Sequence, residues 1–149
     1  METIHQKARK LHAALLRAGY RSYYDEDRAL LFKEMASLEV TLGIPNVLPP
    51  GAQGDVLIQF NNEAGKLSSD LVRVSGSNDL MQVLMACNAI NSQLLYTRFY
   101  LQPTELVVVA DRDFMYADDS YCERIASYLP RFKQDIVDAY ALLQKALSF

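Results

Sequence analysis

The sequence predicts an α+β domain in which an antiparallel sheet packs against helices, in the order helix, strands, helix, two strands, helix. Apolar residues recur every three or four positions in residues 3–18, 80–92 and 122–146, which is the spacing of one helix face. Between these segments, short stretches alternate apolar and polar side chains, as strands do. Half of the 149 residues are hydrophobic, so one core suffices and we expect a single domain, residues 1–149.

The first segment predicts a helix with a basic outer face. Gly19 follows its last apolar residue and tolerates the left-handed conformation in which many helices end. Residues 1–24 hold five basic side chains against one acidic side chain, whereas the rest of the chain holds ten against seventeen. An acidic body repels phosphate, and a lone basic helix face is usually only solvated, so we expect no nucleic-acid binding.

Residues 20–43 leave two alternatives open. Leu38, Val40 and Leu42 alternate with polar residues, which favours a strand and a possible edge for the addition of a partner strand. A helix starting at Asp25 is also possible, because leucine and methionine recur there at helical spacing among good helix formers.

The next segment is rich in residues that interrupt regular structure. Residues 44–54 hold three prolines and two glycines, and they predict a loop. Residues 55–60 and 70–76 then alternate in strand fashion on either side of a polar stretch. This pattern predicts a hairpin.

The middle helix is predicted to end at an asparagine-rich joint. Asn88 and Asn91 lie three residues apart, and asparagine competes well for the backbone groups left open at a helix end. We therefore expect both to shape the connection to the next strand. The predicted inner face of this helix comprises Leu80, Leu84, Cys87 and either Ile90 or Asn91.

From residue 94 onward the side chains alternate between two faces, which is the pattern of a strand. Tyr96, Arg98 and Tyr100 are predicted to lie on the strand face opposite Phe99. If helices cover the Phe99 face, these three side chains line an outer surface suited to a peptide or a second subunit, because Tyr and Arg are enriched in interfaces. A proline-containing turn then leads into a strand at residues 106–110.

The last segment predicts a long helix that covers the sheet. Its apolar residues alternate spacings of three and four, and further apolar residues widen the stripe beyond a coiled-coil seam. Pro130 lies inside this pattern and removes a helical hydrogen bond, so we expect a kink or two abutting helices.

The cysteine content and the polar start of the chain suggest a cytoplasmic protein. Cys87 and Cys122 each fall on an apolar helical stripe, where a free thiol behaves as a small hydrophobe and suits a reducing compartment. No apolar run approaches the length of a membrane span, and the first ten residues lack the apolar stretch of a signal peptide.

Candidate catalytic groups each have a structural explanation. Cys87 has no nearby cation to activate it, and His5 and His12 share a helix face with Arg9, whose charge opposes a metal ion. The densest acidic group could hold magnesium or serve a hydrolase, but aspartates between a strand and a helix are typical caps. We expect neither cofactor nor metal, and the acidic group comprises Asp111, Asp113, Asp118 and Asp119.

In this order of elements the chain resembles the YbjN-like proteins, whose fold is similar to that of class I type III secretion chaperones. The resemblance depends on the first helix ending at Gly19-Tyr20, on Asn88 to Asn91, on the strand from Thr97 to Leu101, on Glu105 to Ala110 and on the closing helix. Residues 25–54 depart from it through the length of the Pro-rich loop. The resemblance implies a chaperone-like domain that forms a homodimer and binds an extended partner segment without catalysis.

The sequence thus favours a non-enzymatic adaptor or chaperone that holds a partner polypeptide. The predicted contact residues are Tyr96, Arg98 and Tyr100, together with the possible edge at Leu38, Val40 and Leu42. The alternative is a small metal-dependent hydrolase that uses the cluster from Asp111 to Asp119.

Overall fold

The computed structural model describes residues 3–24, 40–48, 52–60, 65–74 and 80–147. The described elements are α1 (Ile4–Arg17), β1 (Tyr23–Tyr24), β2 (Val40–Leu48), β3 (Ala52–Phe60), β4 (Gly65–Arg73), α3 (Leu80–Gln93), β5 (Arg98–Gln102), β6 (Val107–Phe114) and α4 (Tyr121–Leu147). They confirm the predicted α+β class and its order of elements.

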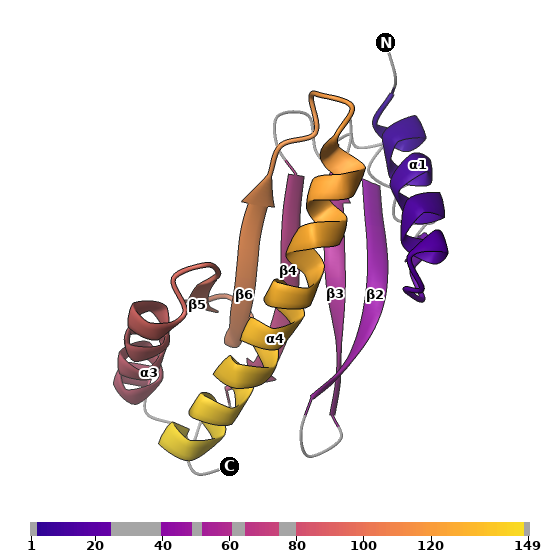
Figure 1. Ribbon diagram of the computed structural model, residues 1–149. Coiled ribbons are helices and arrows are strands. Elements are labelled where there is room, and N and C mark those ends of the chain that lie inside the picture. The colour runs from indigo at the N-terminus through magenta and orange to yellow at the C-terminus, as the bar shows by residue number, and fades with distance from the viewer. Residues whose placement is uncertain (1–2, 25–39, 49–51, 61–64, 75–79, 148–149) are drawn as a thin grey trace.

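The described strands form one antiparallel sheet in the order β1-β2-β3-β4-β6-β5. Strand β6 lies between β4 and β5, so the hairpin formed by β5 and β6 pairs with the rest of the sheet through β6. In Figure 1, α4 crosses in front of the sheet, α1 lies beside β2, and α3 lies at the opposite side next to β5. The described helices therefore cover one face of the sheet.

The core lies between that face and the helices. Alternate residues of each strand point into it, as the period of a strand requires. Fully buried side chains from α1 and α4 meet them there. The largest of these core side chains include Leu11, Leu15, Leu42, Ile58, Phe60, Phe99, Tyr121 and Phe132.

Helix α1 begins and ends where its sequence predicts. The hydroxyl of Thr3 accepts a hydrogen bond from the backbone N–H of Gln6, and the Gln6 side chain accepts one from the backbone N–H of Thr3, which forms a capping box. At the other end Gly19 has a φ of 91°, and the N–H of Tyr20 donates to the carbonyl of Leu15 at 3.0 Å. A left-handed residue with this bond is a common helix stop.

The loop predicted for residues 44–54 is wrong at residues 44–48 and 52–54, which are strand, whereas residues 49–51 lie outside the described residues. Residues of β2 and β3 pair along their whole length, and Pro45 lies opposite Asp55 inside this hairpin. Among the described strands, the two-residue β1 is the one beyond β2, and it pairs with β2 at Gly43 and Leu42. A strand near the sheet edge tolerates proline, because its missing N–H has no partner to lose.

The close contact between β1 and β2 explains Gly43. A Cβ atom at this position would lie 2.0 Å from the Tyr23 ring, so a larger residue would displace that ring. The Tyr23 hydroxyl donates to Asp55 Oδ2 at 2.7 Å and ties β1 to β3 across β2. Residues 40–43 are thus strand, whereas the helix considered from Asp25 lies outside the described residues.

Helix α4 is one continuous helix, so the expectation of two abutting helices is wrong. Pro130 lies on its exposed side, away from the sheet. The helix faces the core with residues at spacings of three and four, and this burial stabilises it despite the bond lost at Pro130.

The predicted inner face of α3 is partly wrong. Cys87 and Ile90 are buried as expected, but Leu80 and Leu84 are each 45% exposed. Val83 and Ala86 take their places in the core. Every position of this helix is uncharged and most are apolar, so the sequence offers little contrast between its two faces.

Candidate functional site

Arg98 and Tyr100 lie on the outer face of the sheet, as predicted, while Phe99 between them is buried. Arg98 Nε donates to Asp111 Oδ1 at 2.8 Å, and its Nη2 lies 3.4 Å from Asp113 Oδ2. Lys66 Nζ lies 3.8 Å from Asp111 Oδ2. We call Lys66, Arg98, Tyr100 and Asp111 the outer sheet surface.

The outer sheet surface presents positive groups above a buried negative one. The side chain of Asp111 is only 3% exposed, whereas those of Arg98 and Lys66 are 63% and 37% exposed. The ion pair with Asp111 raises the pKa of Arg98, mainly through their hydrogen bond. Burial raises the pKa of Tyr100, and so do the charge of the Asp111 carboxylate and the hydrogen bond between the two side chains. The exposed donors of this surface are therefore the cationic groups of Arg98 and Lys66.

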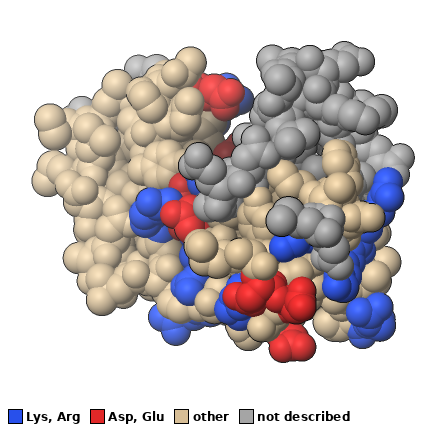
Figure 2. All heavy atoms as spheres, turned by 90° about the horizontal axis from the view of Figure 1, so that it is seen from above, with Lys and Arg blue, Asp and Glu red and all other residues tan. Residues whose placement is uncertain are grey.

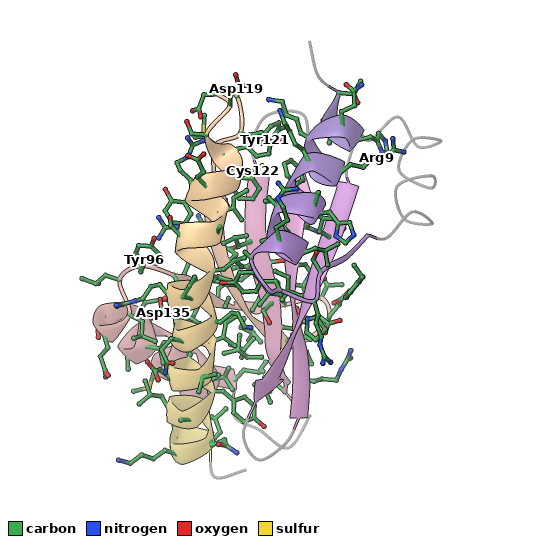
Figure 3. All side chains as sticks on the ribbon, turned by 45° about the vertical axis from the view of Figure 1, so that its right-hand side comes forward. Arg9, Tyr96, Asp119, Tyr121, Cys122 and Asp135 are labelled. Carbon is green, nitrogen blue, oxygen red and sulfur yellow. The ribbon has the colours of Figure 1, made fainter. Side chains whose placement is uncertain are left out.

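Tyr96 does not join that surface. It lies in the turn before β5, where strand alternation has not yet begun. Its ring stacks on the guanidinium of Arg112, with 3.4 Å from Cζ to the ring centroid, and meets the ring of Tyr128 edge-on at 6.1 Å. Because Tyr128 belongs to α4, Tyr96 faces the helix side of the sheet, and Figure 3 shows it beside α4.

A buried carboxylate on α4 was not singled out from the sequence. Asp135 is 1% exposed, and its Oδ2 accepts a hydrogen bond from the Thr97 hydroxyl at 2.8 Å. Arg131 Nε lies 3.2 Å from Asp135 Oδ1. The spacing of four between Arg131 and Asp135 is a detectable sequence signal, but Thr97 is distant in the chain. These contacts fix the turn before β5 against α4.

The edge proposed for strand addition is not available at Leu42. This residue pairs with Tyr24 on one side and with Ile58 on the other, and its side chain is fully buried. Val40 begins β2 opposite Phe60. Leu38 lies outside the described residues.

The acidic cluster divides into two separate groups. Asp111 and Asp113 are on β6 and share Arg98, whereas Asp118 precedes α4. Asp118 Oδ1 accepts hydrogen bonds from the backbone N–H of Ser120 at 2.9 Å and from Arg124 at 2.7 Å. These hydrogen bonds lower the pKa of Asp118, the one from Arg124 most. Asp118 thus orders the turn that leads into α4, but this bond is not the predicted helix cap, because Ser120 precedes the first helical residue, Tyr121.

The remaining candidates also have structural roles. His12 Nδ1 lies 2.6 Å from the Ser22 hydroxyl, and this contact links α1 to the segment that leads into β1. Burial raises the pKa of Cys87, which opposes a reactive thiolate. Within the described ranges, no three His, Cys, Asp or Glu residues are placed to hold a metal ion.

Helix α3 exposes the most concentrated group of large apolar side chains in the described structure. Leu80 and Leu84 are each 45% exposed, and Met81 and Met85 are 62% and 64% exposed. Residues four apart lie one above the other on a helix, so these side chains form one surface. We call these four residues the α3 surface.

The α3 surface has no charged residue on its own helix. The 14 residues of α3 include no Asp, Glu, Lys or Arg. In Figure 2 the left-hand margin of the molecule, the side on which α3 lies in Figure 1, is free of charged side chains. The opposite face of α3 is anchored in the core, and Gln82 Nε2 donates to the carbonyl of Ala146 on α4 at 3.1 Å. The helix is therefore held with its apolar surface outward.

Asn91 fulfils its predicted role at the end of α3. Its Nδ2 donates to the carbonyl of Phe99 at 2.8 Å, and its Oδ1 accepts from the Phe99 N–H at 2.8 Å. Asn88 is exposed on the neighbouring face of the helix. The joint between α3 and β5 therefore depends on one asparagine.

None of the described helices is both long enough and apolar enough to cross a membrane. A scan of protein-family models gives no match to the chain, and a search of curated proteins finds no significant relative. Among solved structures, the chain is similar to a chain of the heterodimeric ExoU–SpcU complex from the type III secretion system of Pseudomonas aeruginosa. The identity is 14%, the TM-score is 0.46, and the similarity covers 69% of this chain and 82% of the other. So weak a likeness assigns neither a family nor a function.

Proposed function

We propose that the protein is a non-enzymatic adaptor or chaperone that forms a homodimer and holds a partner polypeptide. The observation behind this proposal is the α3 surface, an uncharged helix face with four exposed leucine and methionine side chains. A helix at the surface of a soluble domain normally exposes charged residues, as α1 does with Arg9, Lys10 and Arg17. Exposed apolar patches of this kind mark contact with another protein.

A second copy of the chain is the occupant that the charge distribution favours for the α3 surface. The chain has a net charge of −3, so a symmetric contact through a charged face would bring like charges together. The charge-free α3 surface avoids this repulsion, since a two-fold interface places the same patch of both copies face to face. Methionine side chains adapt readily to such a contact.

The partner polypeptide is assigned to the outer sheet surface. Arg98 and Tyr100 extend from the face of the sheet opposite α4, and both residue types are enriched at interfaces. Tyr96, stacked on Arg112, is left out of this assignment. The two free cysteines suit a reducing compartment, so we place the protein in the cytoplasm. Membership of the YbjN-like family also stays a prediction.

Affinity capture from the native lysate tests the partner assignment. Wild-type protein should retain one polypeptide in stoichiometric amount, and Tyr100→Ser should lose it because the ring and its hydroxyl are removed. Leu16→Gln is the matched control, since Leu16 is 51% exposed on α1 and should retain the polypeptide. Equal retention by Tyr100→Ser, or no retained polypeptide with the wild type, would contradict the assignment.

A further inference from the structure

Strand β5 lies at the edge of the sheet. It has five residues and pairs with β6 alone among the described strands. An edge strand presents unpaired N–H and C=O groups along its free side, and these groups can pair with a strand of another chain. The outward backbone groups of β5 therefore decide whether this edge can accept a partner.

The side chain of Asn91 is hydrogen-bonded to the backbone N–H and C=O groups of Phe99 in β5. Both backbone groups of Phe99 are bonded to the Asn91 side chain at 2.8 Å, although Phe99 lies opposite Ala110 of β6. They must therefore point away from β6, toward the free side of the strand. A primary amide supplies one donor and one acceptor, so Asn91 replaces the pair of hydrogen bonds that an added strand would make at this residue.

Little of the β5 edge remains open beside Asn91. Backbone groups on one side of a strand recur every second residue, so Leu101 is the only other residue of β5 whose groups point outward. An incoming strand would have to pair with both Phe99 and Leu101. It cannot do so while the Asn91 amide is bonded to the backbone groups of Phe99. Helix α3 also lies directly beside β5, as Figure 1 shows.

We propose that Asn91 blocks the β5 edge of the sheet against backbone pairing with another polypeptide, so that a partner meets this side of the sheet through side chains and not by strand addition. The block is a property of the folded monomer. It would hold whether or not the α3 surface binds a second copy.

The wild-type protein provides the first test, by amide hydrogen exchange of the two outward residues of β5. The Phe99 amide should exchange at least about fivefold more slowly than the Leu101 amide, because its hydrogen bond must open first. Equal exchange rates for Phe99 and Leu101 would overturn the proposal.

The second test opens the edge by Asn91→Ala, made together with Met85→Gln so that association through the α3 surface is suppressed. We expect the double variant to show a mass above that of a monomer, rising with concentration, and to show Phe99 protection that also rises with concentration. Asn88→Ala with Met85→Gln is the matched control and should stay monomeric, since Asn88 is exposed one turn earlier on the same helix.

A folded Asn91→Ala double variant that remains monomeric at all concentrations would also overturn the proposal. Circular dichroism establishes that the variant is folded. If it does not fold, the exchange rates of Phe99 and Leu101 in the wild type decide the matter. A failure of the α3 proposal would be seen separately, as a wild-type protein that is already monomeric.

Discussion

Replacing Met85 by glutamine should weaken the proposed homodimer without unfolding the chain. Glutamine has nearly the length of methionine and a similar helix propensity, and residue 85 is 64% exposed in the single chain, so little core packing is lost. The change replaces an apolar side chain of the α3 surface by one that ends in a polar amide. It therefore tests the interface and leaves the fold intact.

The size of the effect follows from the exposed part of the side chain. Complete burial of a methionine side chain contributes about 1.5–3 kcal/mol, so covering the 64% that is exposed contributes about 1–2 kcal/mol. A two-fold interface contains the residue twice, which gives about 2–4 kcal/mol per dimer. This corresponds to a dissociation constant that is about 30- to 700-fold higher in Met85→Gln.

Light scattering and sedimentation over a wide concentration range measure this shift. The wild type and Leu16→Gln should dimerise with the same dissociation constant, because Leu16 is an exposed leucine on a different helix. Thermal unfolding of the diluted proteins controls for a change in the stability of the monomer. A wild type that is monomeric throughout, or a Met85→Gln variant that dimerises as tightly as the wild type, would refute the assignment of the α3 surface.

The remaining predictions concern stability. Asp118→Asn should lower the melting temperature at neutral pH, because the hydrogen bond from Arg124 depresses the pKa of Asp118 and so stabilises the folded chain. As the pH falls through that pKa, the wild-type carboxylate becomes protonated, and the difference in melting temperature between wild type and variant should vanish. Thr97→Val should cost about 1–3 kcal/mol in denaturant titration, since it leaves the buried Asp135 carboxylate short of a donor; an unchanged midpoint would contradict this role. Pro130→Ala should raise the free energy of unfolding by up to about 3 kcal/mol, because it restores a hydrogen bond inside α4, and the melting temperature should rise with it. A lower melting temperature would show that the helix is adapted to the proline.

Local sequence predicts α1 and α4 well, because each carries a strong contrast between an apolar face and a charged one. The Thr3 capping box and the left-handed Gly19 lie within a few residues of the ends they define. Asn91 likewise lies near the end of α3, and its position predicts a role in the connection to the next strand. Such features need no information from distant parts of the chain.

The orientation of α3 could not be predicted from spacing. Leu80, Leu84 and Val83 are all apolar, and no charged residue marks the solvent side of the helix. Only packing against the sheet and the end of α4 decided that Val83 is buried and the two leucines are exposed. The same absence of charge that obscured the prediction is what makes the α3 surface a candidate for protein contact.

Side-chain placement around β5 likewise depended on tertiary structure. The sequence alternates from residue 94, but the strand begins at Arg98, so Tyr96 lies in the preceding turn and faces α4 and Arg112. Pro45 was expected in a loop and lies in a strand, because its position next to the short β1 tolerates a missing N–H.

The α+β class, the order of the elements and the ends of α1 could be predicted from the sequence. These follow from periodicity and local hydrogen bonding, which act over a few residues. Contacts between distant segments place β6 between β4 and β5 and bury Asp111 beneath Arg98, and the fold brings Asn91 to both backbone groups of Phe99. Strand order and burial are set by contacts between residues far apart in the chain, so the proposed partner surface at Arg98 and Tyr100 depends on segments that only the folded chain brings together.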